Sequence, residues 1–164
     1  LWVENGVPYM IYCHEWVEME DGTMELVELK PDLSGTVGQP IRLFCASAAE
    51  WSTGSLREDG TRTYVTDGCF LYRTQTGKLL MIWSSFKNGE YAIGIAESMT
   101  GKVFGPWKQQ KEPLFDKHGG HGMIFKTFDG RLCVVLHAPN SPGGAERAHI
   151  FEIEDLGHTL KLKK

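Results

Sequence analysis

One pattern recurs three times along the chain: a short strand, a tight turn that contains glycine, and a second strand rich in apolar residues. The copies lie at 1–14, 65–85 and 121–137, and they turn at Gly6, Gly77 and Gly130. Hairpin turns favour glycine because it adopts positive φ without a steric cost. In the middle copy, residues 79–83 are apolar without a break, which indicates a strand covered on both faces.

Each hairpin is followed by a second pair of strand signals, so each unit holds about four strands. We expect these outer pairs at 24–29 with 41–44, at 91–96 with 113–115, and at 149–153 with 156–162. Four-stranded units that repeat every 40–50 residues or so are typical of a β-propeller. The sequence therefore predicts an all-β fold, a β-propeller with about three four-stranded blades. The alternative is a β-sandwich with unrelated hairpins.

The chain has 164 residues, enough for one domain with its own core. Propellers close with about four to eight blades, so three blades form an open arc with exposed apolar flanks. Residues 1–3 already have the pattern of a strand. We therefore expect the C-terminal part of a single, longer propeller. The alternative is that copies of the chain close the arc by oligomerisation.

Composition excludes several classes of partner. The formal net charge of −4 argues against a nucleic acid or an anionic membrane surface. No apolar run reaches the roughly 18 residues that a membrane span needs. The spacing of the four cysteines, Cys13, Cys45, Cys69 and Cys133, matches no zinc motif.

Polar and aromatic side chains gather where strands are expected to end. His14, Glu15 and Trp16 follow the second strand of the first unit. Sugars stack their apolar faces on aromatic rings, so we predict that Trp16 and His14 contact a carbohydrate. Trp51, in the connecting segment 46–63, is a second candidate contact. The alternative for both tryptophans is a packing role in a loop.

Two titratable residues open the innermost strands of the second and third units. Asp67 is followed by Gly68, which allows other groups to approach closely, and His121 is surrounded by three glycines. We expect His121 to face the propeller axis, where an imidazole can bind a metal ion or hydrogen-bond a catalytic group.

At these residues the chain resembles glycoside hydrolase family 43, which comprises five-bladed β-propeller arabinofuranosidases, xylosidases and arabinanases. The motifs that carry the resemblance are 66–72, 101–107 and 120–125, with Asp129, Gly130 and His137. The resemblance spans nearly the whole chain and covers the last three of five blades. It implies blade 3 at about 1–45, blade 4 at about 66–116 and blade 5 at about 120–164.

The resemblance implies an O-glycosyl hydrolase of arabinofuranosidase or xylosidase type that acts on plant polysaccharide or oligosaccharide. The family uses an aspartate base, an aspartate that tunes the acid, and a glutamate acid, and it is described as inverting. In inverting chemistry one carboxylate activates water and the other protonates the leaving oxygen, about 6.5–9.5 Å away. Both aspartates would precede Leu1, so we expect the chain alone to be inactive.

Asp67 matches the family's acid position, which is usually a glutamate followed by Gly-Pro. Aspartate is one methylene shorter, a difference of about 1.5 Å, and a misplacement of about 1 Å can lower a rate about a hundredfold. Asp67 is therefore the first candidate for the acid, and Glu15 on the neighbouring blade is the second. His121 matches a histidine that, in the family, lies near a calcium or sodium ion or its waters in the central channel. No organic cofactor is implied.

The partners that follow are an oligosaccharide or polysaccharide substrate and either the missing N-terminal blades or another chain that completes the propeller. Two rivals remain. One is a non-catalytic carbohydrate-binding propeller fragment that holds sugar through Trp16, Trp51 and His121. The other is a purely structural interaction propeller, which leaves the glycines around His121 unexplained.

Overall fold

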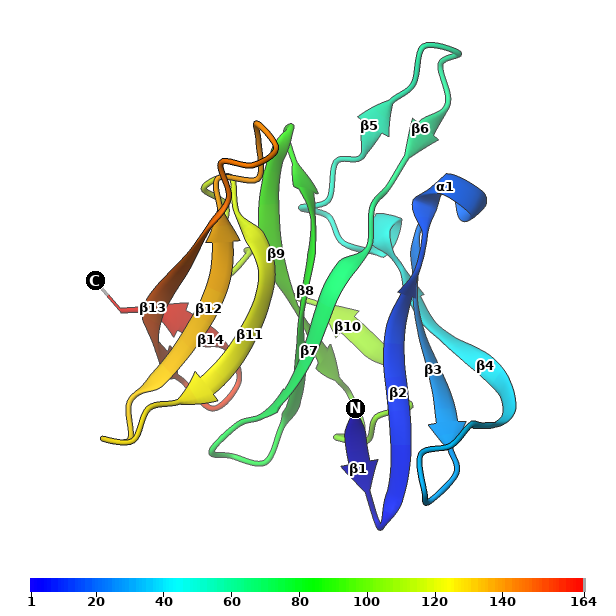
Figure 1. The fold of residues 1–164 in the computed structure, drawn as a ribbon, viewed down its shortest axis with the longest axis vertical. Coiled ribbons are helices and arrows are strands. Elements are labelled where there is room, and N and C mark those ends of the chain that lie inside the picture. Colours follow the sequence, from blue (N-terminus) through cyan, green and yellow to red (C-terminus); the bar gives the residue numbers. More distant parts are fainter. Residues whose placement is uncertain (164) are drawn as a thin grey trace.

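The computed structural model describes residues 1–163, and strands make up most of its regular structure (Figure 1). Three antiparallel four-stranded sheets follow one another along the chain, with a two-stranded hairpin between the first and the second. This confirms the predicted all-β fold with three propeller blades. The numbering of these sheets as third, fourth and fifth blades stays a prediction.

The first sheet has the strand order β1-β2-β3-β4. Its strands are β1 (Trp2–Glu4), β2 (Val7–His14), β3 (Thr23–Leu29) and β4 (Thr36–Cys45). A helix of a single turn, α1 (Trp16–Met19), joins β2 to β3. After β4 come a short 3₁₀ turn, η1 (Ala46–Ala48), and the hairpin of β5 (Ser55–Leu56) and β6 (Arg62–Thr63).

The second, middle sheet has the order β10-β9-β8-β7, and the third has the order β11-β12-β13-β14. The middle strands are β7 (Asp67–Arg73), β8 (Leu79–Lys87), β9 (Glu90–Ser98) and β10 (Trp107–Gln109). The third sheet contains β11 (Gly120–Lys126), β12 (Leu132–Ala138), β13 (Arg147–Asp155) and β14 (Leu160–Leu162). The outer strand expected at 113–115 was wrong, because that segment contributes only an isolated bridge between Ile93 and Phe115.

The core lies on both sides of the middle sheet. Alternate side chains of β8 point to opposite faces, as the period of a strand requires. Leu80 and Ile82 pack toward the third sheet, in a cluster that includes Ile124, Val134 and Leu136. Met81 and Trp83 pack toward the first sheet, in a cluster that includes Met24, Phe44 and Trp51. The unbroken apolar run of β8 is thus explained by burial on both faces.

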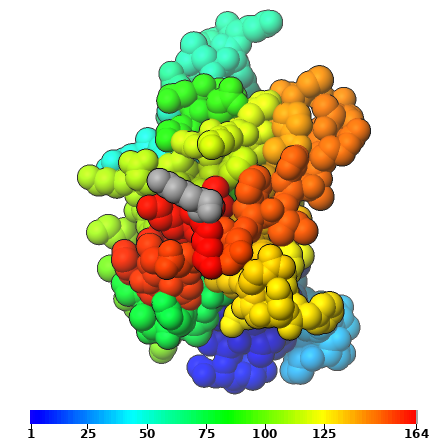
Figure 2. Space-filling model, turned by 90° about the vertical axis from the view of Figure 1, so that its left-hand side faces the viewer, coloured from blue at the N-terminus to red at the C-terminus, as the bar shows by residue number. Residues whose placement is uncertain are grey.

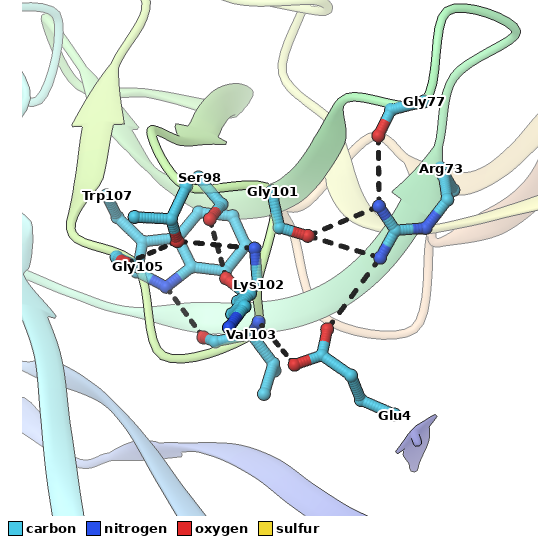
Figure 3. Close-up of polar contacts among 10 residues, drawn as sticks. Glu4, Arg73, Gly77, Ser98, Gly101, Lys102, Val103, Gly105 and Trp107 are labelled. Carbon is cyan, nitrogen blue, oxygen red and sulfur yellow. Dashed lines mark hydrogen bonds and ion pairs between the residues drawn. The ribbon is translucent and has the colours of Figure 1, made fainter. Parts of the chain in front are cut away.

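A polar clasp joins the first and middle sheets at one end of the molecule (Figure 3). Arg73 at the end of β7 donates to the carbonyls of Gly77 and Gly101, and its guanidinium lies 3.8 Å from Glu4 of β1. The other oxygen of Glu4 accepts a 3.4 Å bond from the Val103 amide. The motif at 101–107 therefore has a structural role, because its backbone bonds to Arg73 and Glu4.

The residues that the sequence analysis predicted as site residues lie at the opposite end of the sheets. In Figure 1 the end of β2, α1, and the starts of β7 and β11 all lie toward the top, and the β5–β6 hairpin projects beyond them. Figure 2 shows the side of the molecule formed by the last strands, in orange and red. Within residues 1–163, no helix is long and apolar enough to cross a membrane.

Candidate active site at the inner strand ends

Matching irregularities open the inner strands of the middle and third sheets. The β7–β8 register shifts between Asp67 and Phe70, and the β11–β12 register shifts between Gly120 and Met123. Each irregular segment contains one residue at positive φ: Gly68 at 44° and His121 at 55°. Bulges of this kind re-aim side chains and are frequent beside active sites.

The two segments lie against each other. A Cβ atom added at Gly68 would lie only 2.8 Å from the Cα and Cγ atoms of His121. Glycine is therefore required at position 68 for the close approach, as its place in the sequence predicted. The approach brings His121 Nδ1 to 3.2 Å from Oδ1 of Asp67.

Asp67 is held by three donors. The Tyr91 hydroxyl donates to Oδ2 at 2.7 Å, the Gly68 amide donates to Oδ1 at 2.9 Å, and His121 contacts Oδ1. Burial alone would raise the pKa of Asp67, but the hydrogen bonds from His121 and Tyr91 outweigh it and lower the pKa below its ordinary value. The three donors therefore favour the ionised form of this carboxyl group.

Tyr91 of β9 is a site residue that the sequence analysis missed. Its ring stacks on His137 with 5.5 Å between centroids and an interplanar angle of 18°. Ser84 lies beside it and accepts a 2.8 Å bond from the His121 amide. Burial and the nearby Asp67 charge raise the pKa of Tyr91, so its hydroxyl stays a donor. A tyrosine inside an apolar strand has the pattern of a core residue, so no sequence signal separated it from its neighbours.

Glu15 and Trp16 lie at the same end of the molecule, at the start of α1. The Glu15 side chain is exposed, and its carbonyl accepts the amides of Glu18 and Met19. Burial raises the pKa of the Cys13 thiol, and the charges of Asp67 and Glu15 raise it further. Glu15 follows the end of β2 and Asp67 begins β7, and these two strands are neighbours.

The predicted substrate contacts have different surroundings. Trp16 is half-buried, with the Arg57 guanidinium 5.3 Å from its ring centroid. Each ring nitrogen of His14 contacts a carboxylate, Glu18 or Glu25. Trp51 is 4 % exposed, and its ring packs at a tilt against Trp83 in the core, with 4.9 Å between centroids. The sugar contact predicted for Trp51 is therefore wrong, because a buried ring presents no face to a ligand.

A metal ion would find few ligands among the described side chains. Calcium takes six to eight oxygen ligands, whereas residues 1–163 contain no group of three or more His, Cys, Asp or Glu side chains placed to hold an ion. His121 is paired with Asp67 through Nδ1. The calcium or sodium ion implied by the resemblance stays a prediction, and no chemical step is derived from it.

A shallow cavity of about 280 Å³ lies beside His121, lined also by Val135, His137, Glu146 and Arg147. The cavity therefore adjoins the pair formed by His121 and Asp67. The side chain of His121 is 56 % exposed. A cavity of about 550 Å³ is lined by Arg73, Asp129 and other residues at the opposite end of the strands. Of these two cavities, the smaller one adjoins the predicted site.

Solved structures with the same architecture include an endo-arabinase, a family-43 glycoside hydrolase and a xylanase. An endo-arabinase from Bacteroides thetaiotaomicron matches with a TM-score of 0.86 and 44% sequence identity, over 94% of this chain and 54% of that one. A thermostable family-43 glycoside hydrolase matches with a TM-score of 0.82 and 23% identity, over 100% of this chain and 56% of that one.

An endo-1,4-beta-xylanase, also from Bacteroides thetaiotaomicron, matches with a TM-score of 0.79 and 18% identity, over 100% of this chain and 57% of that one. The two matches under 25% identity are evidence of a shared fold alone. The chain spans about half the length of the solved structures that it matches. No family model matches it, and no curated protein matches it either.

Proposed function

We infer that this chain is part of a glycosidase that cleaves arabinose- or xylose-type linkages in plant polysaccharide. The solved structures that it matches confirm its resemblance to glycoside hydrolase family 43. The observation that supports this inference most is the half-buried carboxylate of Asp67, which three donors hold at the strand ends where Glu15 and Trp16 also lie. The 44% identity to an endo-arabinase over 94% of the chain favours arabinan among the substrates.

We propose the reverse order for the two candidates for the acid, with support from the hydrogen bonds of Asp67. Asp67 accepts from Tyr91, Gly68 and His121, all of which stabilise its ionised form. Glu15 is exposed and directly follows β2, the strand that neighbours β7. We therefore assign the proton donor to Glu15, and to Asp67 the role of a fixed negative charge beside the reacting sugar.

Each side chain then has one task. Ionised Asp67 stabilises the positive charge that develops on the sugar ring as the glycosidic bond breaks. Glu15 protonates the departing oxygen, and Trp16 stacks on a neighbouring sugar. The carboxylate that activates water belongs to the part of the propeller that this chain does not contain, so we expect the chain alone to bind sugar without hydrolysing it.

Leaving-group dependence tests this assignment in the full-length protein. A general acid matters most when the leaving group is a poor one, such as a sugar hydroxyl. Glu15→Gln should lower the rate on linear arabinan by about 10²–10⁴-fold and should spare a dinitrophenyl arabinofuranoside. Asp67→Asn should slow both substrates. If Asp67→Asn shows the leaving-group dependence and Glu15→Gln does not, the roles are the reverse of those proposed.

The rival, a non-catalytic carbohydrate-binding propeller, makes a different prediction. Arabinan or xylan would then bind with no hydrolysis by the full-length protein, and Trp16→Ala would abolish binding. Hydrolysis of any aryl arabinoside or xyloside by wild-type protein, lost in both carboxylate variants, excludes that rival.

A further inference from the structure

His14 lies between two carboxylates. Its Nε2 atom is 2.9 Å from Oε2 of Glu18 in α1, and its Nδ1 atom is 3.3 Å from Oε1 of Glu25 in β3. An ionised carboxylate is only an acceptor, and a neutral imidazole has only one N–H to donate. Both contacts are satisfied together when His14 is an imidazolium.

Glu25 is the fixed side of this arrangement. Its side chain is 14 % exposed, and it also accepts from the Tyr12 hydroxyl at 3.0 Å and the Thr23 hydroxyl at 3.1 Å. Burial raises the pKa of Glu25, but the hydrogen bonds from Tyr12, Thr23 and His14 together lower it. Glu25 therefore remains ionised, and the proton between the pair belongs to His14.

The other side of the arrangement is intrinsically weak. The helix α1 has four residues, no side-chain cap at its start and no buried residue, and it ends at Glu20 with φ at 61°. A helix this short is not stable on its own. Two backbone hydrogen bonds hold the segment that follows α1. The Tyr64 amide donates to the Glu20 carbonyl, and the Gly22 amide donates to the Tyr64 carbonyl. The His14–Glu18 pair is the side-chain tie between α1 and the first sheet.

We propose that His14, as an imidazolium between Glu18 and Glu25, is a positioning residue that fixes α1 and so holds Glu15 and Trp16 in place at the site. This replaces the substrate contact predicted for His14, since both of its ring nitrogens are already engaged. The catalytic meaning of the placement depends on the proposed function, whereas the clamp itself does not.

The clamp extends to the projecting hairpin. Trp16 lies under the guanidinium of Arg57, which belongs to the turn between β5 and β6. Fixing α1 therefore also fixes the Trp16–Arg57 stack, which joins α1 to the hairpin at the rim of the site. The charged groups that face His14 are Glu18 from α1 and Glu25 from β3, and both raise its pKa, Glu18 more strongly.

The sign of the pH dependence follows from this raised pKa. The clamp is complete below the ordinary histidine pKa of about 6.5 and is lost as the pH rises through the higher pKa of folded His14. The fixed arrangement of α1 should therefore loosen as the pH rises through that raised pKa, not in acid.

Nuclear magnetic resonance on the protein tests the clamp without any assay of activity. Labelled histidine should show both nitrogens of His14 protonated at pH 6.5, with a titration midpoint that falls in Glu18→Gln and in Glu25→Gln. Overhauser contacts between Trp16 and Arg57 should weaken in wild-type protein as the pH rises through that midpoint. An exposed pair of this kind implies a shift in the α1 equilibrium of up to about fivefold.

Two variants and one control separate the outcomes. Glu18→Gln, at a side chain 74 % exposed, should fold normally and show weak Trp16–Arg57 contacts that no longer depend on pH. His14→Gln should behave in the same way, while His158→Gln, at an exposed histidine outside the clamp, should match wild type. A neutral His14 at pH 6.5, or a Trp16–Arg57 stack unchanged in Glu18→Gln, overturns the proposal. Absence of glycosidase activity leaves these readouts intact.

Discussion

The middle and third sheets have the same four-stranded design but differ in what covers them. In the middle sheet, residues 79–85 of β8 are buried on both faces. In the third sheet, Met123, Val135 and Ile150 form one row across β11, β12 and β13. Met123 is 49 % exposed and Ile150 is 64 % exposed.

This difference shows that the apolar faces of a blade are buried only where another sheet packs against them. Ile95 of β9, the counterpart of Ile150 in the strand register, is 1 % exposed because the third sheet lies over that face, whereas no described residue covers Ile150 in this way. The first sheet repeats the pattern, with Val3 and Met10 exposed. Exposed apolar rows on both end sheets fit the proposal that further blades, in the same or another chain, cover them.

The largest expected effect is the loss of Trp83. Its ring is fully buried and lies near Phe44 and Trp51. Trp83→Ala should lower the free energy of unfolding by about 3–5 kcal/mol, measured by chemical denaturation. Ile150→Ala is the control on the open face and should stay within about 0.5 kcal/mol of wild type. Equal losses in the two variants would contradict the contrast between the sheets.

The second prediction moves the Ile150 variant into the full-length protein. If a further blade covers the third sheet, Ile150 becomes a core residue and Ile150→Ala should then cost about 2 kcal/mol or more. Thermal melts of the chain and the full-length protein, each with its variant, make the comparison. An unchanged, near-zero cost in the longer protein would show that the row stays open there.

The third prediction compares a glycine from each sheet. Gly68→Ala and Gly130→Ala both place a side chain at positive φ, which costs about 1–2 kcal/mol. Only at Gly68 does the added Cβ meet His121, while at Gly130 it meets nothing within 4 Å. The first variant should therefore lose about 1–3 kcal/mol more. Similar unfolding free energies for the two would mean that the strands separate at little cost.

The smallest expected effect is the pH dependence that Asp67 contributes. Its lowered folded-state pKa stabilises the protein above the unfolded pKa of about 3.9, and this stability is lost as the pH falls through the folded value. The side chain is 36 % exposed, so screening keeps the contribution near or below about 1 kcal/mol. Asp67→Asn should lose less stability between pH 6 and pH 3 than wild type; an identical slope would contradict this.

Much of the fold was predictable because the repeat is encoded locally. The turns at 74–78 and 127–131 show it most clearly: the amides of Thr74 and Gly77 make the same two bonds as those of Thr127 and Gly130. Glycine at one position and an apolar run after it are enough to specify such a hairpin. The apolar run of β8 also predicted a neighbour on each face, and both neighbours are present.

The site was less predictable because its geometry depends on distant segments. Asp67 and His121 were found from their glycine neighbours, but the bulges that bring them together leave no mark in the sequence. Tyr91 was missed because its hydroxyl partner lies 24 positions away. Trp51 was misjudged because the gap that it fills, against Gly94, is formed by a different sheet.

The hairpin at 127–131 is also a natural point of attachment. Its tip is open, with Phe128 fully exposed and no atom within 4 Å of a Cβ at Gly130. It belongs to the end of the strands that faces away from Asp67 (Figure 1). A fluorophore or affinity tag placed there would report on the protein, or hold it on a support, without obstructing access to the end that carries Asp67.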